Sequence, residues 1–435
     1  MGLAAEHESP EDPDATEVRV ALTAAAVKQL VDHGRDVVVE SGAGVRMGFS
    51  DDDYRAAGAT IVSRDELYRD REVVIKLKGP THADLATMDR GSLLICMAHV
   101  KSLPERAAIC DERAINLLAL ELVTEQPPRG EAYVRSRLAM QRILAEDGRP
   151  AGELHVAFGG FSRDAFGALQ HAARSHPRSL QMLASGAAYR APDDVGGTLL
   201  VDPGTLADGA AQIPAGEVEP ELLRLPARRK IESLHETGRA GARFGIDLTV
   251  RTSERLDAAR DAGVTVLGYG NVAFGALDEC VRSGVSHVHI RTERTTEHAL
   301  LRPHLESSDL IINGIDGRDD PRSYVVTNDD LGSVIRPGTV VVDLVGGSAT
   351  NRGAVEPIVE CTSPGDPYFV VDGVYLASVW GWPLVGFAQE SMQRYSEQIL
   401  RMLLTDERIL DGFESPPDGI RPALVAGPLS RGQPG

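Results

Sequence analysis

The sequence predicts an α/β protein with two parallel-sheet lobes, a cleft between them and an inserted subdomain. Short apolar runs alternate with helix-like segments from Val18 to Val123, and a second stretch with the same alternation begins at Val264. Strands separated by helices are typical of parallel sheets covered by helices. At roughly 150 residues per domain, the 435 residues amount to about three domain-sized units, so a third part is expected besides the two lobes.

The strands of each lobe are expected at its apolar runs. In the first lobe these are VRVAL, DVVVE, EVVIKLK, SLLICMA and INLLALELV, with a helix around AAAVKQLVDHG. In the second lobe they are VTVLGYG, SHVHI, DLIING, TVVVDLV and YFVVDGVYLA. Apolar residues at helical spacing from Phe387 to Phe413 predict an amphipathic helix that packs back on one of the lobes.

These elements divide the chain into three parts. Residues 1–123 form an N-terminal lobe that is completed by C-terminal helices in residues 387–435, and residues 231–386 form the second lobe with its connecting helix. Residues 124–230 contain turn-rich stretches such as EQPPRG and APDDVGG beside a strand candidate, LHVAFGG. We expect them to fold as a separate inserted subdomain.

Charge and cysteine content narrow the class of protein. The formal net charge of −19 opposes binding to nucleic acid or to anionic membranes. The four cysteines form no C-x-x-C pair and no secretory signal is visible, so a reducing, cytoplasmic setting is expected. Cys96 and His99 form a single C-x-x-H, which lacks the further ligands that a metal site needs, and no metal is predicted.

A glycine-rich turn opens the second lobe. The strand VTVL is followed by Gly268 and Gly270 and then by a helix that begins with Asn271 and Val272. The first glycine permits a tight turn, and the second lets backbone N–H groups approach a pyrophosphate at the helix N-terminus. This is the context of a Rossmann-like dinucleotide site.

The cofactor-binding set also includes residues at the ends of the following strands. They are Arg291, Thr292, Asn313, Gly314 and Leu344.

The end of the next strand predicts which dinucleotide is bound. An acidic side chain there would bind the ribose diol of NAD, whereas basic side chains accept a 2′-phosphate. The sequence places Arg291 and Thr292 at this point, with Arg294 close behind. We therefore predict a preference for NADP(H), while NAD(H) binding stays open because Glu293 is able to reach a ribose.

Basic residues at strand ends of the first lobe predict a binding site for a carboxylate. Arg19 lies in VRVALT, Lys76 and Lys78 lie in EVVIKLK, and His99 follows SLLICMA. An Arg and a Lys hold a carboxylate, and a neighbouring His exchanges protons near neutral pH. The first lobe is thus predicted to bind the substrate.

At these segments the chain resembles the alanine dehydrogenase and pyridine nucleotide transhydrogenase family, which includes carboxyethylornithine synthase and the lysine-forming saccharopine dehydrogenases. The resemblance rests on EVRVALT, VVIKLKGP, LLICMAH, GYGNVAFGA, IRPGTVVVDL and DPYFVVDGVYLASVWGWP. It implies that Arg19, Lys78 and His99 bind and polarise a 2-oxo acid or imino acid, with His99 and Lys78 catalytic and Arg19 and Lys78 substrate-binding. It also implies a homo-oligomer.

Two positions depart from the family pattern. The register at which the family carries an Asp after the strand V-V-D falls on Gly347, and the family segment V-A-N-M-P reads here as Val379 to Pro383 with no Asn. Both changes remove polar groups beside the nicotinamide. Trp380 and Trp382 flank the second change and are expected to shape the substrate pocket.

The sequences of the motifs and the predicted NADP preference most resemble those of carboxyethylornithine synthase. This implies an NADPH-dependent enzyme that reductively condenses an amino-acid amine with a 2-oxo acid, or reduces the derived imine, to give an opine-type secondary amine. His99 would supply the acid, and Glu121 is one candidate to hold a basic co-substrate, or else a helix-facing salt bridge. Two alternatives stand beside this: a simple amino-acid (alanine-type) dehydrogenase, and a redox-inactive nucleotide-binding protein.

Overall fold

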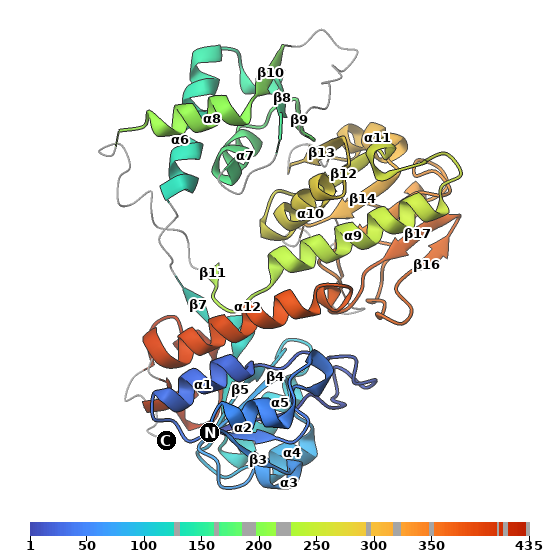
Figure 1. Ribbon diagram of the computed structural model, residues 1–435. Helices are drawn as coiled ribbons and strands as arrows, with labels where there is room; N and C mark the ends of the chain where they lie inside the picture. The colour runs from blue at the N-terminus through green and yellow to red at the C-terminus, as the bar shows by residue number, and fades with distance from the viewer. Residues whose placement is uncertain are drawn as a thin grey trace. The chain divides into compact units, whose positions relative to one another are not determined.

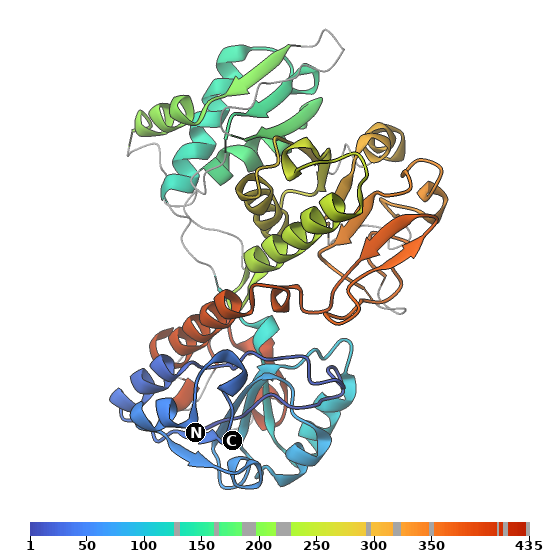
Figure 2. The ribbon, with the colours of Figure 1, turned by 45° about the vertical axis from the view of Figure 1, so that its right-hand side comes forward.

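The computed structural model describes most of the chain in two compact units. The described residues are 1–125, 131–160, 165–184, 197–214, 228–292, 297–315, 323–347, 352–406, 409–411 and 416–431. Unit 1 comprises Met1–Pro127, Pro226–Ser233 and Phe387–Gly435, and unit 2 comprises Pro128–Leu225 and Leu234–Gly386. Each unit contains one large sheet, as Figures 1 and 2 show.

The sheet of unit 1 has seven strands in the order β18-β6-β5-β4-β1-β2-β3. All neighbours are parallel except β18, which runs antiparallel to β6. The strand bounds are β1 Gly2–Leu3, β2 Val38–Glu40, β3 Thr60–Val62, β4 Val73–Lys78, β5 Leu93–Met97, β6 Asn116–Ala119 and β18 Leu424–Ala426.

Helices cover this sheet, and buried apolar side chains lie on both of its faces. Ser50 and Thr81 form capping boxes that fix the starts of two of these helices. The C-terminal helix lies alongside α1 (Figure 1), where the Thr23 N–H donates to the Ser396 hydroxyl at 2.9 Å. The helix bounds are α1 Ala24–Asp32, α2 Asp51–Ala56, α3 Arg64–Leu67, α4 His82–Thr87, α5 Pro104–Arg113 and α12 Ala388–Arg401.

The first strand of unit 1 differs from the sequence prediction. The segment VRVAL is buried but forms no strand, so that prediction is wrong. Gly2–Leu3 instead occupies the place between β2 and β4, with Leu3 opposite Val39 and Ile75. The predicted strands DVVVE, EVVIKLK, SLLICMA and INLLALELV are confirmed as β2, β4, β5 and β6.

The sheet of unit 2 has nine strands in the order β10-β8-β9-β13-β12-β14-β15-β17-β16. The five strands predicted for the second lobe are present, the last of them as the hairpin β16–β17. The strand bounds are β8 His155–Phe158, β9 Ser179–Leu183, β10 Thr198–Val201, β12 Val264–Leu267, β13 His287–Arg291, β14 Leu310–Asn313, β15 Val340–Asp343, β16 Phe369–Val371 and β17 Val374–Ala377. The two parallel-sheet lobes of the predicted fold class are therefore confirmed.

Residues predicted as a separate subdomain contribute to the sheet of unit 2. Strands β8, β9 and β10 are parallel to one another, and β9 pairs antiparallel with β13, Leu180 lying opposite Ile290. Without β9, the strand β13 would be an exposed edge with unpaired N–H and C=O groups. The short strands β7 Thr124–Glu125 and β11 Arg228–Arg229, at the two ends of this segment, pair antiparallel in unit 1.

Six longer helices lie in the described residues of unit 2. Phe166 of α7 contacts Phe274 of α10 with ring centroids 4.1 Å apart, so α7 joins the segment to the helix that follows the glycine turn. Their bounds are α6 Glu131–Asp147, α7 Phe166–Arg174, α8 Pro203–Ala211, α9 Leu234–Thr252, α10 Asn271–Arg282 and α11 His298–Ser307.

Glycines allow α9 and α10 to pack with their backbones in close contact. A Cβ at Gly275 would lie 2.1 Å from the His235 carbonyl oxygen, and one at Gly238 would lie 2.0 Å from that of Val272. Side chains in such places force backbone shifts that typically cost about 1–3 kcal/mol. The sequence therefore requires small residues at this crossing.

We expect Gly275→Ala to lower the midpoint of thermal unfolding of unit 2 by several degrees. Calorimetry measures the shift. The matched control is Gly209→Ala in α8, where the new methyl would meet only Ala139 Cβ at 3.4 Å. Since alanine favours a helix over glycine, the control should unfold at or above the wild-type temperature, and an equal loss in both variants would contradict the packing argument.

Candidate functional site

A cluster of charged residues lies where β4 and β5 end in unit 1. These strands are parallel neighbours, with Lys78 opposite Met97, and His99 follows two residues later. Lys78 and His99 are close enough for the charge of Lys78 to lower the pKa of the imidazole. The structure thus brings together two of the side chains that the sequence predicted to be catalytic.

His99 is held in an unusual backbone conformation. Its φ angle is +49°, which a residue with a side chain rarely adopts. The backbone N–H groups of Ala98 and His99 donate to the Glu121 carboxylate at 3.0 and 2.6 Å. Glu121 therefore positions the His99 backbone, a role that sequence reasoning did not assign to it.

The imidazole of His99 is short of partners. Its Nε2 atom is buried and makes no hydrogen bond within the described part of the chain. Burial and, secondly, the charge of Lys78 lower the pKa of His99 to about 4. The ring is thus neutral at pH 7. A buried nitrogen without a hydrogen-bond partner destabilises the protein, and a bound ligand would supply that partner.

Lys78 is itself buried. Burial lowers the pKa of its ammonium group, and the negative charge of Glu17 opposes this effect. A buried ammonium beside a carboxylate keeps its charge more readily than an isolated one. Lys78 is suited to bind an incoming carboxylate.

Arg19 is buried and strongly anchored. Its Nε and Nη2 atoms both donate to the Glu17 carboxylate at 2.7 Å, and Nη1 donates to the Ser391 hydroxyl at 3.0 Å. The guanidinium also lies over the Tyr395 ring at 5.3 Å. A guanidinium has five N–H donors, and three of them donate to these partners. The other two are suited to a substrate carboxylate.

Sequence reasoning missed three carboxylates of this cluster in the acidic N-terminal segment. Glu6 bonds to Lys76 Nζ at 2.7 Å and to the Leu77 N–H at 2.8 Å. Glu11 accepts from the Gly79 N–H at 2.8 Å and pairs with buried Arg106. The sequence feature that would have indicated them is the presence of glutamates at positions 6, 11 and 17, in the segment that leads to Arg19.

The glycine turn in unit 2 has the geometry predicted for a dinucleotide site. Gly268 has φ +100°, and a Cβ there would lie 3.3 Å from the Gly314 backbone, so only glycine fits. Gly270 precedes α10, no side chain caps that helix, and a Cβ at Gly270 would meet nothing within 4 Å. Open space beside uncapped N–H groups, with Asn271 exposed, fits a pyrophosphate.

Neighbouring strand ends gather beside this turn. The Gly314 N–H donates to the Leu267 carbonyl at 2.8 Å, and the Leu344 N–H donates to the Asn313 carbonyl at 2.9 Å. The Asn313 amide also donates to Asp343 at 2.8 Å. Gly314, Asn313 and Leu344 thus lie at the carboxyl edge of the sheet, where ligands of open α/β sheets bind.

Arg291 and Thr292 lie at the end of β13, next to the turn. The Gly268 N–H donates to the Arg291 carbonyl at 2.9 Å. Both side chains are buried, and the Arg291 guanidinium is in contact with His304 of α11. The predicted neighbours Glu293 and Arg294 lie outside the described residues.

Helix α7 also reaches the glycine turn. Gln170 donates from Nε2 to the Tyr269 carbonyl at 3.2 Å and accepts from the Tyr133 hydroxyl at 2.6 Å. The segment between the predicted lobes therefore supports the turn from the side. No sequence motif indicated this contact.

The two tryptophans have different surroundings. Trp382 is buried, its indole N–H donates to the Asp343 carbonyl at 2.9 Å, and its ring lies 5.5 Å from that of Phe244. Trp380 is half-buried. Gly347, where the resemblance predicts the register of the family Asp, accepts a hydrogen bond from the Cys361 thiol at 3.6 Å.

Two kinds of feature are absent from the described residues. They contain no group of three or more His, Cys, Asp or Glu side chains arranged to hold a metal ion. In the same residues no helix has the length and apolar character needed to cross a membrane.

The fold and the glycine turn of unit 2 are those of a dinucleotide-binding α/β protein. The chain belongs to the alanine dehydrogenase and pyridine nucleotide transhydrogenase family, as its sequence motifs predicted. The family model "Alanine dehydrogenase/PNT, N-terminal domain" matches residues 9–134, and the corresponding C-terminal domain matches residues 244–409. The matches leave out most of the segment that adds β8 to β10.

Relatives with names in the same family align over most of the chain. An NAD(P) transhydrogenase subunit alpha from Cereibacter sphaeroides is 27% identical over 395 residues, which cover 90% of this chain and 63% of that protein. An alanine dehydrogenase from Halomonas elongata is 28% identical over 366 residues, covering 82% of this chain and 76% of that protein.

The fold is also similar to a solved structure of L-alanine dehydrogenase. The TM-score is 0.51 at 20% identity, and the match covers 98% of this chain and 94% of that one. The chain thus spans just under two thirds of the length of the transhydrogenase subunit and nearly all of the solved dehydrogenase.

Proposed function

We propose that the chain is an NADPH-dependent oxidoreductase that reductively condenses an amino-acid amine with a 2-oxo acid, or reduces the derived imine, to give a secondary amine. The observation that carries it is the buried cluster of Arg19, Lys78 and His99, which combines fixed positive charge with an unpartnered imidazole nitrogen. Family membership and the glycine turn of unit 2 support a nicotinamide dinucleotide as co-substrate.

The residues of unit 1 have separate tasks in this reaction. Lys78 and Arg19 bind the carboxylate of the 2-oxo acid and fix the orientation of the carbon that reacts. That carboxylate brings negative charge to His99, which raises the pKa of the imidazole from its lowered value. His99 then donates a proton to the hydroxyl of the carbinolamine, which leaves as water and yields the imine.

The dinucleotide supplies a hydride to the imine carbon when it is bound. Unit 2 provides its site through Gly268, Gly270, Asn271 and Val272, and the ends of later strands complete it. We assign the half-buried Trp380 and the buried Trp382 to shaping the substrate pocket, where the family Asn is replaced. This change and Gly347 at the register of the Asp favour a bulky amine over ammonia.

The test is a search for condensed products. The chain is incubated with NADPH, a set of 2-oxo acids and a set of amino acids that includes ornithine and lysine. Mass spectrometry should find products whose mass equals that of the amine plus the oxo acid, less one water and plus two hydrogens. One NADPH should be oxidised for each product formed. A dehydrogenase would instead oxidise NADPH with ammonium and a single 2-oxo acid.

A simple amino-acid dehydrogenase is the second candidate. The names of the Halomonas relative and of the similar solved structure favour it. A redox-inactive nucleotide-binding protein is the third candidate. Nucleotide binding without turnover of any substrate would support it. A cytoplasmic homo-oligomer stays a prediction of the sequence.

We expect NADPH to bind at least tenfold more tightly than NADH. The end of β13 carries Arg291 and Thr292 where a carboxylate would favour NAD. Arg291 meets the 2′-phosphate in this proposal by exchanging its contact with His304 for the anion. Titration of nucleotide fluorescence measures both affinities, and comparable or tighter binding of NADH would contradict the predicted preference.

A further inference from the structure

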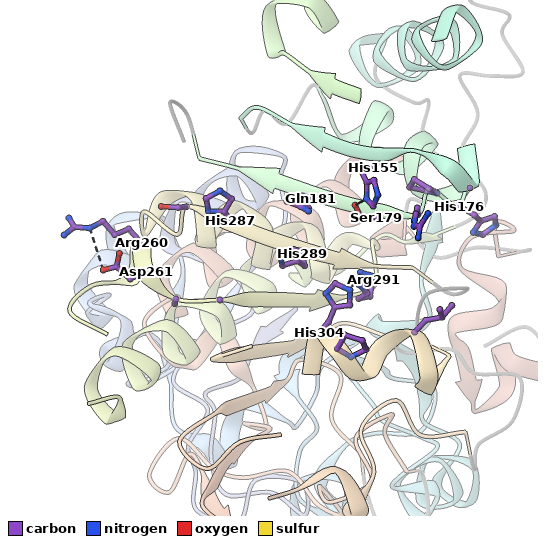
Figure 3. Close-up of a pocket in the computed structure, with 18 residues that line it drawn as sticks. His155, His176, Ser179, Gln181, Arg260, Asp261, His287, His289, Arg291 and His304 are labelled. Atoms are coloured by element: carbon purple, nitrogen blue, oxygen red, sulfur yellow. Dashed lines mark hydrogen bonds and ion pairs between the residues drawn. The ribbon is translucent and has the colours of Figure 1, made fainter. Parts of the chain in front are cut away.

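A large pocket lies on the face of the unit 2 sheet that carries α11. Its volume is about 1000 Å³, and strands β8, β9 and β13, the residues just before β12 and helix α11 contribute to its wall (Figure 3). We call it the histidine pocket, because five histidines line it. They are His155, His176, His287, His289 and His304.

Strand geometry places these side chains together. Alternate residues of a strand point to the same face, so His287, His289 and Arg291 of β13 all line the pocket. Figure 3 shows His289, Arg291 and His304 next to one another. The rings of His289 and His304 have centroids 5.2 Å apart, and the Arg291 guanidinium contacts the His304 ring.

The positive charge of the pocket comes from its arginines, in a chain whose net charge is −19. Arg178, Arg260 and Arg291 line it beside the histidines, of which His289 and His304 are neutral at pH 7. Among the described residues in its wall, Asp261 is the one carboxylate, and it is exposed and lies 3.8 Å from Arg260. The inner end of the pocket, around Arg291, has no negative charge in its described wall.

Several polar atoms of the pocket are buried without partners. Nδ1 of His176, Nδ1 of His289 and Nε of Arg291 make no hydrogen bond in the part of the chain that the structure describes. Burial first, then the charge of Arg291, lowers the pKa of His289 to about 4 and that of His304 to about 3. Burial also lowers the pKa of Arg291 to about 10.

Such an arrangement is costly for the isolated protein. A buried polar group without a partner destabilises the fold, and burial disfavours the charged form of Arg291. An anion in the pocket would accept hydrogen bonds from these nitrogens and stabilise the charge of Arg291. The described wall contains no Phe, Tyr or Trp on which an aromatic base would stack, so the charge is its main means of recognition.

We propose that the histidine pocket binds a small polyanion, a metabolite that carries phosphate or several carboxylate groups. Its volume is at the upper end of the range for small-molecule sites. The glycines of the dinucleotide turn are not part of its wall, although Arg291 is. The pocket is therefore a second ligand site of unit 2, formed mainly because β8 and β9 extend the sheet beyond β13.

The experiment is calorimetric titration of the whole chain with pyrophosphate and, in a separate arm, with citrate. One molar equivalent of at least one probe should bind, and the preferred probe identifies phosphate or carboxylate as the recognised group. Because His289 and His304 are neutral beforehand, binding should take up protons, which titrations in two buffers of different ionisation enthalpy detect. Failure of both probes to bind would overturn the proposal.

Variants locate the bound probe. His289→Gln and His304→Gln should each weaken binding at least tenfold, and Arg178→Gln, at an exposed position, tests the same wall without disturbing the core. His82→Gln, an exposed histidine of α4 in unit 1, is the matched control and should bind like the wild type. Unchanged affinity in all three pocket variants would refute the site.

A competition arm separates this site from the dinucleotide site. With saturating NADH, which has no 2′-phosphate and so leaves Arg291 in the pocket, pyrophosphate should still bind with one equivalent. If NADH abolishes its binding, the pocket cations belong to the nucleotide site and the proposed second site is wrong. Condensation activity does not enter this readout, so failure here leaves the proposed reaction standing.

Discussion

Replacing His99 with Gln is expected to lower kcat/KM for the condensation by roughly 10²- to 10⁴-fold, the usual contribution of a positioned general acid. Gln keeps a polar side chain of similar length but has no proton to give at an imidazole nitrogen. NADPH affinity should stay within about twofold, because the nucleotide residues lie on β12 to β15. Steady-state rates and nucleotide titration measure the two effects.

The pH profile distinguishes proton transfer from a structural role. Protonated His99 is the active form for dehydration, so the rate should fall as pH rises through the pKa of His99. In the unliganded protein that pKa is lowered to about 4, and the bound carboxylate raises it. The decline of kcat with rising pH should therefore occur at higher pH than the decline of kcat/KM. Neither decline should be seen in His99→Gln.

Two further variants serve as controls for His99. His82→Gln removes an exposed histidine of the same unit and should leave the rate unchanged. Glu121→Gln weakens the hydrogen bonds from the Ala98 and His99 N–H groups. It should lower kcat less than His99→Gln does and should keep the decline of the rate with rising pH. Wild-type turnover by His99→Gln would remove the proposed acid.

Local motifs predicted the parts of the site that depend on neighbouring residues in the sequence. Gly268 and Gly270 are close in the chain, and the turn they form needs only the strand before and the helix after it. His99 was predicted on the same basis, as the polar residue that follows a buried strand. Its support by Glu121 was not foreseen, because that contact joins β5 to the residues after β6.

The N-terminal strand shows where sequence patterns are insufficient. Six of the first 17 residues are acidic, and β1 is only two residues long, too short for a periodic signal. VRVAL was predicted as a strand because it is apolar. Most of the segment is buried, yet none of its residues pairs with a strand. Apolar character predicts burial, whereas strand formation also requires a partner with a matching edge.

The pairing of β9 with β13 was beyond sequence reasoning for a related reason. These strands are about a hundred residues apart in the chain, and nothing in LHVAFGG or SLQML specifies an antiparallel partner. An uncovered edge at β13 is a property of the folded second lobe. The histidine pocket follows from that pairing, since His155 and His289 are brought to one face only when the two segments share a sheet.

Glu17→Gln is expected to cause the largest loss of stability in unit 1. The carboxylate and the Arg19 guanidinium are both buried and form two hydrogen bonds at 2.7 Å. Removing one partner of a buried ion pair costs about 3–5 kcal/mol, because an uncompensated charge remains. Scanning calorimetry should show the unfolding midpoint of unit 1 falling by roughly 10 °C.

The loss should depend on pH in a definite direction. Arg19 and Lys78 lower the pKa of Glu17 from 4.5 to about 2 despite its burial. A group with a depressed pKa in the folded state stabilises the fold above its unfolded pKa, and that stability, about 3 kcal/mol here, is lost as pH falls from 4.5 towards 2. The wild type and Glu17→Gln should therefore differ most at pH 7 and converge near pH 2.

A double variant separates the charge from the packing. Glu17→Met and Arg19→Met together remove both members of the ion pair, and apolar replacement of a buried pair is often neutral or stabilising. Lys78 loses the charge of Glu17 in both variants, so the comparison isolates the effect of Arg19. We expect the double variant to recover most of the stability that Glu17→Gln loses, while losing substrate binding with Arg19. If it is as unstable as Glu17→Gln, the cost comes from packing around Ser391 and Tyr395, and the ion pair is not what stabilises this part of the lobe.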